Sequence, residues 1–192
     1  MKTEILRIVA EDAALCTECE LHRSRTCSVF ARGNPDAAVM FIGEAPGREE
    51  NETGSPFVGA AGELLDTLIE KMGLGDAVYI CNAVKCWPPE NRAPTREERE
   101  ACAPYLVNQI RIVQPRVIVA LGRTAMLALG PLYDSVYRSD SGRWRGQWRR
   151  AQGIPVMPTY HPAFVLRNPE AKKAVGIDMG KVLKRLGAED LT

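Results

Sequence analysis

The ten residues AVMFIGEAPG, at positions 38–47, decide the fold class of this chain. The apolar run Ala38–Ile42 predicts a buried strand, which a turn rich in glycine and proline ends at once. Strands that alternate with helices predict an α/β fold with a mostly parallel sheet covered on both faces. Three more strand-length apolar runs and four helical patterns complete the alternation: strands at Val78–Cys81, Val117–Leu121 and Ile154–Met157, and helices at Gly62–Met72, Thr95–Val113, Arg123–Leu129 and Ala171–Leu186.

Length and composition fit one globular domain over residues 1–192, with 45% hydrophobic and 26% charged residues. No apolar run reaches the roughly 18 residues that a membrane span needs, so we expect no membrane contact. Residues 1–16 form an amphipathic pattern rather than a secretion signal. We therefore expect a cytoplasmic protein, nucleoid-associated if the source is a prokaryote.

The net charge of +1 is unevenly divided along the chain. Residues 1–96 contain 10 basic and 15 acidic side chains, and residues 97–192 contain 15 basic and 9 acidic ones. The two halves therefore carry −5 and +6. An excess of positive charge in the second half is compatible with a polyanionic partner, although mixed-charge surfaces are common.

Four of the six cysteines form two pairs that suggest a metal site. Cys16 and Cys19 form a C-x2-C pair, and Cys86 and Cys102 flank a proline-rich stretch. Four thiolates suit either zinc or an iron–sulfur cluster, and the wide second spacing favours iron–sulfur over a zinc ribbon. On position alone Cys27 is a rival ligand, and six unrelated buried thiols are the alternative.

Several informative residues follow predicted strands, where ligands bind in parallel α/β sheets. The turn GEAPG follows the first strand, Asn82 the second and His161 the fourth. Phe57 lies in the glycine- and proline-rich loop TGSPFVG, where packing and stacking on a ligand are equally plausible roles. A lone histidine is more often structural than catalytic, so the convergence of these residues on one sheet edge carries the argument.

The motifs of this chain resemble those of the family 4 uracil-DNA glycosylases, which carry a [4Fe–4S] cluster. The similar segments occur in the same order: GEAPGREENETGSPFVGAAGELL at 43–65, YICNAVKCWPPENRAPT at 79–95, PRVIVALG at 115–122 and PVMPTYHPAFVLRNP at 155–169. The resemblance implies a three-layer α/β/α sandwich with a central four-stranded, mostly parallel sheet. It also implies cleavage of the N-glycosidic bond of uracil in DNA, leaving an abasic site in base-excision repair.

The resemblance also assigns roles to residues. By the family pattern the cluster ligands are Cys16, Cys19, Cys86 and Cys102, which leaves out Cys27 and Cys81. Phe57 would stack on the flipped uracil, Asn82 would bind its polar edge, and His161 would lie against O2. The loop HPAFVLR, which ends at Arg167, would contact the DNA and press Val165 or Leu166 into the gap left in the duplex.

The general base is not assigned by the motifs. Ala45 stands where family 1 enzymes carry a water-activating Asp, and family 4 members commonly have Gly or Ala there. Glu44 and Glu50 are the remaining candidates to orient water or screen the sugar cation, and Glu50 could also exclude the thymine methyl group. The family often has Asp where this chain has Asn51, so we expect a missing charge at the outer edge of that loop.

The arginine-rich segment Arg138–Arg150 contains Trp144 and Trp148. We interpret the tryptophans as packing residues and expect some of the arginines to contact phosphates. The expected partner is uracil-containing DNA, single- or double-stranded, and the protein is expected to be a monomer. Contact with a sliding clamp is left open by the sequence.

Two other functions compete with glycosylase activity. A uracil-binding relative crosslinks to its product through a histidine in an inserted loop, but the loop WPPENRAPT contains no histidine. A non-catalytic iron–sulfur DNA-binding module would not need the set Phe57, Asn82 and His161.

Overall fold

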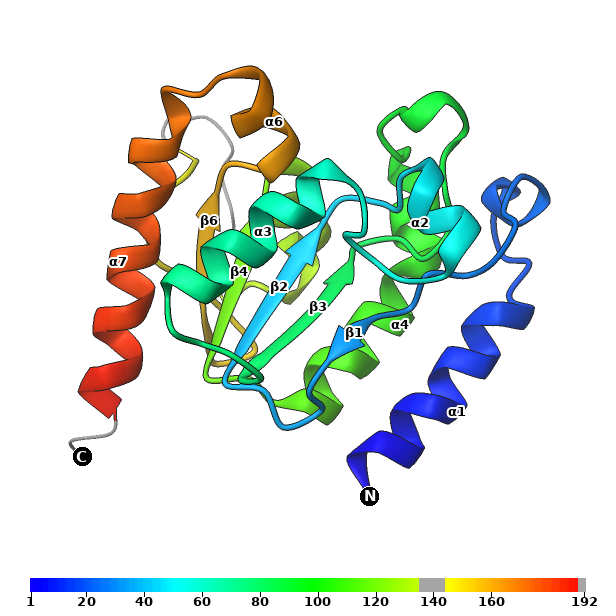
Figure 1. Ribbon diagram of the computed structural model, residues 1–192. Helices are drawn as coiled ribbons and strands as arrows, with labels where there is room; N and C mark the ends of the chain where they lie inside the picture. The colour runs from blue at the N-terminus through cyan, green and yellow to red at the C-terminus, as the bar shows by residue number, and fades with distance from the viewer. Residues whose placement is uncertain (135–143, 190–192) are drawn as a thin grey trace.

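The computed structural model describes residues 1–134 and 144–189 of the chain, and its centre is a six-stranded sheet (Figure 1). The strand order is β1-β3-β2-β4-β6-β5. The four inner strands run parallel, and the two edge strands pair antiparallel with their neighbours. The strands are β1 (Arg32–Gly33), β2 (Val39–Gly43), β3 (Val78–Asn82), β4 (Val117–Leu121), β5 (Arg149–Ala151) and β6 (Ile154–Thr159).

The expected α/β fold with a mostly parallel sheet is confirmed, but the expected number of four strands is wrong. The four apolar runs became the four parallel strands, because each is buried on both faces of the sheet. The additional strands β1 and β5 contain two and three residues and lack an apolar run. They form only because an edge of the sheet offers them unpaired main-chain groups.

Helices cover both faces of the sheet. The α-helices are α1 (Lys2–Leu15), α2 (Arg48–Thr53), α3 (Ala60–Lys71), α4 (Arg96–Val113), α5 (Arg123–Ala128), α6 (Pro162–Arg167) and α7 (Ala171–Glu189). Short 3-10 helices lie at Glu20–Arg23, Pro89–Asn91 and Gly130–Leu132. Figure 1 shows α3 in front of the strands and α4 behind them. No helix within these described residues is long and apolar enough to cross a membrane.

The alternation of side chains along β2 divides the core in two. Val39 and Phe41 pack with residues of α3 and α7 on one face, whereas Met40 and Ile42 pack with residues of α1, α4 and α5 on the other. All four side chains are fully buried. Because each such burial contributes about 1.5–3 kcal/mol, the sheet is fixed from both sides. The loops at its carboxyl edge therefore start from rigid strand ends.

Candidate active site

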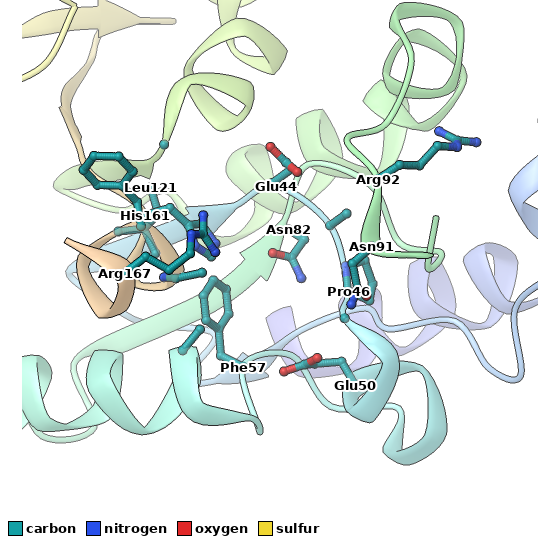
Figure 2. Close-up of a pocket in the computed structure, with 16 residues that line it drawn as sticks. Glu44, Pro46, Glu50, Phe57, Asn82, Asn91, Arg92, Leu121, His161 and Arg167 are labelled. Carbon is teal, nitrogen blue, oxygen red and sulfur yellow. The ribbon is translucent and has the colours of Figure 1, made fainter. Parts of the chain in front are cut away.

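A cavity of about 400 Å³ opens at the carboxyl edge of the parallel strands (Figure 2). The expected site residues meet here, since parallel strands end at one edge. The lining includes the turn after β2, the end of β3, the end of β4 and one side of α6. Residues expected from the sequence that line it are Glu44, Ala45, Glu50, Phe57, Asn82, His161 and Arg167.

Phe57 forms one wall of the cavity, and two glycines, Gly43 and Gly62, leave the space that it occupies. Its backbone is left-handed, with φ of 57°, and its side chain is only 6% exposed. A Cβ on Gly62 would lie 1.8 Å from the Phe57 carbonyl oxygen, and a Cβ on Gly43 would lie 2.5 Å from its Cζ. Larger residues at either position would displace the ring. The Phe57 ring stacks near His161, with 5.7 Å between ring centres and 27° between planes.

Glu50 holds the loop that carries Phe57. Its Oε1 accepts hydrogen bonds from the main-chain N–H groups of Val58, at 3.0 Å, and Gly59, at 3.1 Å. Figure 2 shows the carboxylate below the Phe57 ring, on α2. The sequence suggested a role in water activation or methyl exclusion, but this carboxylate is engaged with two amides that directly follow Phe57.

Asn82 ends β3 with a carboxamide at the cavity. The residue is 1% exposed, and its Oδ1 is a buried acceptor without a hydrogen-bond partner among the described residues. A Cβ on Gly43 would lie 2.3 Å from this oxygen, so the glycine leaves room for it. An unpaired buried acceptor is unfavourable by roughly 1–3 kcal/mol, which a ligand that donates a hydrogen bond would recover.

His161 is neutral and presents a defined nitrogen to the cavity. Its Nδ1 accepts a hydrogen bond from the N–H of Ala163 at 3.1 Å, where it caps the start of α6. The proton of the neutral ring is therefore on Nε2. Burial lowers the pKa of His161 to about 4, and Arg167 acts in the same direction while Glu50 opposes it. The site thus holds an uncharged N–H donor at neutral pH.

Glu44 and Ala45 lie in the turn after β2, and both line the cavity. The turn is tied to the segment after β3, because the N–H of Val84 donates to the Glu44 carbonyl oxygen. In Figure 2 the Glu44 carboxylate lies on the side of the cavity opposite Glu50. Ala45 has no acidic or basic group. Of the cavity carboxylates Glu44 and Glu50, only Glu50 is hydrogen-bonded to the loop that carries Phe57.

The loop after β3 adds lining residues that sequence reasoning missed. Asn91 and Arg92 line the cavity, and the Arg92 guanidinium donates two hydrogen bonds to the Glu98 carboxylate. Asn91 is left-handed, with φ of 55°, and its Oδ1 accepts from the Trp87 indole at 2.7 Å. The available signal was the proline-rich stretch WPPENRAPT, for which the sequence predicts no role in the cavity.

The two residues expected to enter the DNA, Val165 and Leu166, both lie on α6 but differ in their exposure. Val165 is 4% exposed and packs in the core, which favours Leu166 as the residue that presses into the duplex. Leu166 is 46% exposed and stays available for that contact. Arg167 lines the cavity, and Figure 2 shows its side chain beside His161.

The sequence suggested that Asn51 lies at the outer edge of its loop. In the structure the residue is buried and only 3% exposed. Its Oδ1 accepts from the N–H of Thr26 at 2.8 Å, and its Nδ2 donates to the Thr26 hydroxyl at 3.0 Å. The carboxamide therefore joins α2 to the segment before Cys27. An uncharged side chain with both a donor and an acceptor suits this buried position.

Four cysteines surround a second, smaller cavity, between the end of α1 and the start of α4. They are the expected ligands Cys16, Cys19, Cys86 and Cys102. Arg25 donates to the Cys86 sulfur at 3.3 Å, and the N–H of Lys85 donates to the Cys102 sulfur at 3.3 Å. Hydrogen bonds of this kind suit thiolate ligands.

The four cysteines that line this cavity are a donor set of the kind that holds an iron–sulfur cluster. Within residues 1–134 and 144–189, no three His, Cys, Asp or Glu side chains are close enough to hold one metal ion. In a [4Fe–4S] cluster each thiolate binds a different iron, so no single iron needs three protein ligands. Cys27 does not line this cavity and donates to the Asn51 carbonyl oxygen, while Cys81 is buried in the core.

The segment Arg138–Arg150 is described from residue 144 onward, so its residues 138–143 lie outside the described part of the chain. Trp144 and Trp148 are partly buried and pack against the two core clusters, as the packing interpretation predicts. Arg145 lies over the Tyr160 ring at 5.0 Å and near the Asp178 carboxylate at 3.6 Å. Its guanidinium is therefore held within the fold.

Similarities to known proteins agree with this arrangement. The family model of the uracil DNA glycosylase superfamily matches residues 30–179. The chain is 45% identical over 171 residues to the type-4 uracil-DNA glycosylase of Thermotoga maritima, covering 87% of this chain and 86% of the relative. It is 39% identical over 193 residues to the type-4 uracil-DNA glycosylase of Archaeoglobus fulgidus, covering 98% and 97%. A third such enzyme, from Sulfurisphaera tokodaii, is 42% identical over 185 residues, covering 92% and 83%.

Proposed function

The chain belongs to the type-4 uracil-DNA glycosylases of the uracil DNA glycosylase superfamily, and we propose that it hydrolyses the N-glycosidic bond of uracil in DNA. The products are free uracil and an abasic site, the first intermediate of base-excision repair. The observation that carries the proposal is the unpaired, buried Oδ1 of Asn82 beside the Phe57 ring in the cavity.

Uracil fits the carboxamide of Asn82 because it presents an acceptor and a donor side by side. Its N3–H would donate to Oδ1, and its O4 would accept from Nδ2. The target nucleotide must leave the duplex to reach the cavity, and stacking on Phe57 would recover about 1–3 kcal/mol of that unstacking. Leu166, exposed on α6, would fill the gap left in the stack.

Leaving-group stabilisation is the main catalytic lever. Cleavage leaves negative charge on uracil, much of it on O2, and a neutral His161 would donate to O2 through Nε2. Because Nδ1 is already occupied by the N–H of Ala163, the ring cannot turn its proton away from the cavity. Such a preorganised donor is typically worth about 10²–10³ in rate.

The two carboxylates of the cavity have different roles. Glu50 positions Phe57 through the amides of Val58 and Gly59, which donate hydrogen bonds to its Oε1. Glu44 is then the residue that orients the attacking water or stabilises positive charge on the sugar. Arg167, on the rim of the cavity, would contact the phosphate backbone.

A [4Fe–4S] cluster on Cys16, Cys19, Cys86 and Cys102 would supply a covalent link between α1 and the segment that follows β3. The donor set and the N–H groups directed at two of the sulfurs support this cofactor. Such a link would hold the main chain on both sides of the loop that contributes Asn91 and Arg92 to the active-site cavity.

The proposal is tested by single-turnover cleavage of an oligonucleotide that contains one uracil, followed by alkali to break the abasic site. We expect release of uracil and strand cleavage, and none on matched strands with cytosine or thymine. A covalent protein–DNA adduct would favour the crosslinking alternative, and tight DNA binding without uracil release would favour a non-catalytic module. The absence of histidine from residues 83–95 argues against crosslinking in advance.

A further inference from the structure

Lys85 carries an ammonium group inside the protein. Its residue exposure is 1%, and its Nζ donates to the main-chain oxygen of Asn82 at 2.6 Å. The same nitrogen lies 5.8 Å from the centre of the Phe30 ring. Across the described residues no carboxylate lies within ion-pair distance of it. A buried ammonium is strongly unfavourable without compensating negative charge.

The main chain of Lys85 is fixed next to the cysteine cavity. Its N–H donates to the Cys102 sulfur at 3.3 Å, and its carbonyl oxygen accepts from the N–H of Val29 at 2.8 Å. The next residue, Cys86, is another of the four cysteines, and Lys85 itself lines their cavity. A [4Fe–4S] cluster on four thiolates carries a net negative charge, which would supply the compensation that the ammonium lacks.

We propose that Lys85 is a positioning residue that couples the cysteine site to the uracil pocket. The negative cluster would attract the Lys85 side chain, which in turn fixes the carbonyl of Asn82 through the hydrogen bond of 2.6 Å from Nζ. With that carbonyl fixed, the end of β3 presents the Asn82 carboxamide to the base in one orientation. This inference rests on the proposed function, including the cluster on the four cysteines.

Arg25 provides a comparison within the same site. Its guanidinium also lies at a cysteine, Cys86, but its second contact is the carbonyl oxygen of Ala14 at the end of α1. It therefore adds positive charge beside the cysteines without touching Asn82. Removing either charge should affect the cluster, whereas removing the ammonium of Lys85 should also affect the pocket.

The test uses three variants of the complete, iron-loaded protein and two readouts. Lys85→Met removes the ammonium and keeps the aliphatic stem, Lys85→Gln keeps a neutral donor, and Arg25→Gln is the comparison variant. Lys172→Met, at an exposed position on α7, is the control. The readouts are the midpoint potential of the cluster and the dissociation constant of free uracil.

We expect Lys85→Met, Lys85→Gln and Arg25→Gln to lower the midpoint potential, because each removes a positive charge that favours the reduced cluster. Lys85→Met should also weaken uracil binding about tenfold, the effect of leaving one buried carbonyl unpaired. Lys85→Gln should restore most of that binding while keeping the lowered potential, and Arg25→Gln should change binding much less than Lys85→Met.

Two results would overturn the coupling. One is uracil binding by Lys85→Met within twofold of the Lys172→Met control, and the other is an unchanged potential in both Lys85 variants. If Lys85→Met does not fold, Lys85→Gln provides the test, because it should lower the midpoint potential and keep most of the uracil binding. A Lys85→Gln variant that changes both the potential and the binding, or neither of them, would contradict the proposal. Wild-type protein that binds uracil but does not excise it would refute the proposed function and leave the coupling measurable.

Discussion

Removing the carboxylate of Glu50 should weaken substrate binding without unfolding the protein. Glu50→Ala deletes the oxygen that accepts from the N–H groups of Val58 and Gly59, at 3.0 and 3.1 Å. Hydrogen bonds to a charged group contribute about 1.5–3 kcal/mol each when buried. The amide of Val58 is exposed, and water can replace the carboxylate there, so the loss should be near 2 kcal/mol in total.

This loss should appear in the pocket because the same loop holds Phe57 in a left-handed backbone conformation, with φ of 57°. Such a conformation is unfavourable by roughly 1–3 kcal/mol and persists only when its surroundings enforce it. Without the two hydrogen bonds the loop can relax and move the ring out of its stacking position. A loss of about 1–2 kcal/mol in stacking corresponds to roughly 5- to 30-fold weaker binding.

The assay is single-turnover excision of uracil as a function of enzyme concentration. Glu50→Ala should raise the half-saturating concentration by the factor above and lower the maximal rate less. Glu50→Gln is the matched control, because its Oε1 still accepts from both amides. Equal and large losses of maximal rate in both variants would refute the positioning role and show that the negative charge acts at the reacting atoms.

Three further results follow from the same geometry. His161→Ala should lower the single-turnover rate at least about tenfold more than Glu44→Gln, since it removes the donor to the leaving uracil. Equal losses of rate would instead indicate that activation of water by Glu44 matters as much as stabilisation of the leaving group. Burial lowers the pKa of His161 to about 4, below the value of about 6.5 that it has in the unfolded chain. As the pH falls below about 6.5, His161 is therefore protonated first in the unfolded chain. The contribution of the neutral ring to stability is complete above about pH 6.5 and is lost toward pH 4. Thermal unfolding of wild type should therefore show a steeper loss over this interval than His161→Gln, and parallel curves would contradict the buried neutral ring. Protein prepared without oxygen should contain roughly four irons and absorb at about 400 nm; Cys102→Ala should lose both, Cys27→Ala should keep both, and stoichiometric zinc would contradict the cluster.

The sequence predicted the parallel core of the sheet and the edge where the site lies, because both follow from local patterns. Apolar runs of strand length identify the four inner strands, and the polar residues after them must share one edge. The short strands β1 and β5 carry no such pattern and depend on pairing with a strand that is distant in the chain. The places of Asn82 and His161 after two of these strands predict that they meet, the resemblance assigns Phe57 to the same pocket, and all three line the cavity.

Contacts between segments account for what the sequence could not predict. The hydrogen bonds of Glu50 depend on how the loop after α2 folds back, which no spacing rule encodes. The burial of Val165 beside an exposed Leu166 depends on which face of α6 meets the core. Asn51 is buried because Thr26, which is distant in the chain, packs against it. Its position in a run of polar residues therefore wrongly predicted an exposed side chain.

The most direct test of the whole account is single-turnover excision by Asn82→Asp on otherwise identical strands that contain uracil or cytosine. The variant replaces the donor of the carboxamide with an acceptor, at a residue that is 1% exposed. Uracil O4 would then face an acceptor, at a loss of about 1–3 kcal/mol for each unpaired group, while the amino group of cytosine would find a partner. We predict a large fall in uracil excision with weak cytosine excision appearing. Uracil excision within a few-fold of wild type would contradict the claim that Asn82 recognises the base.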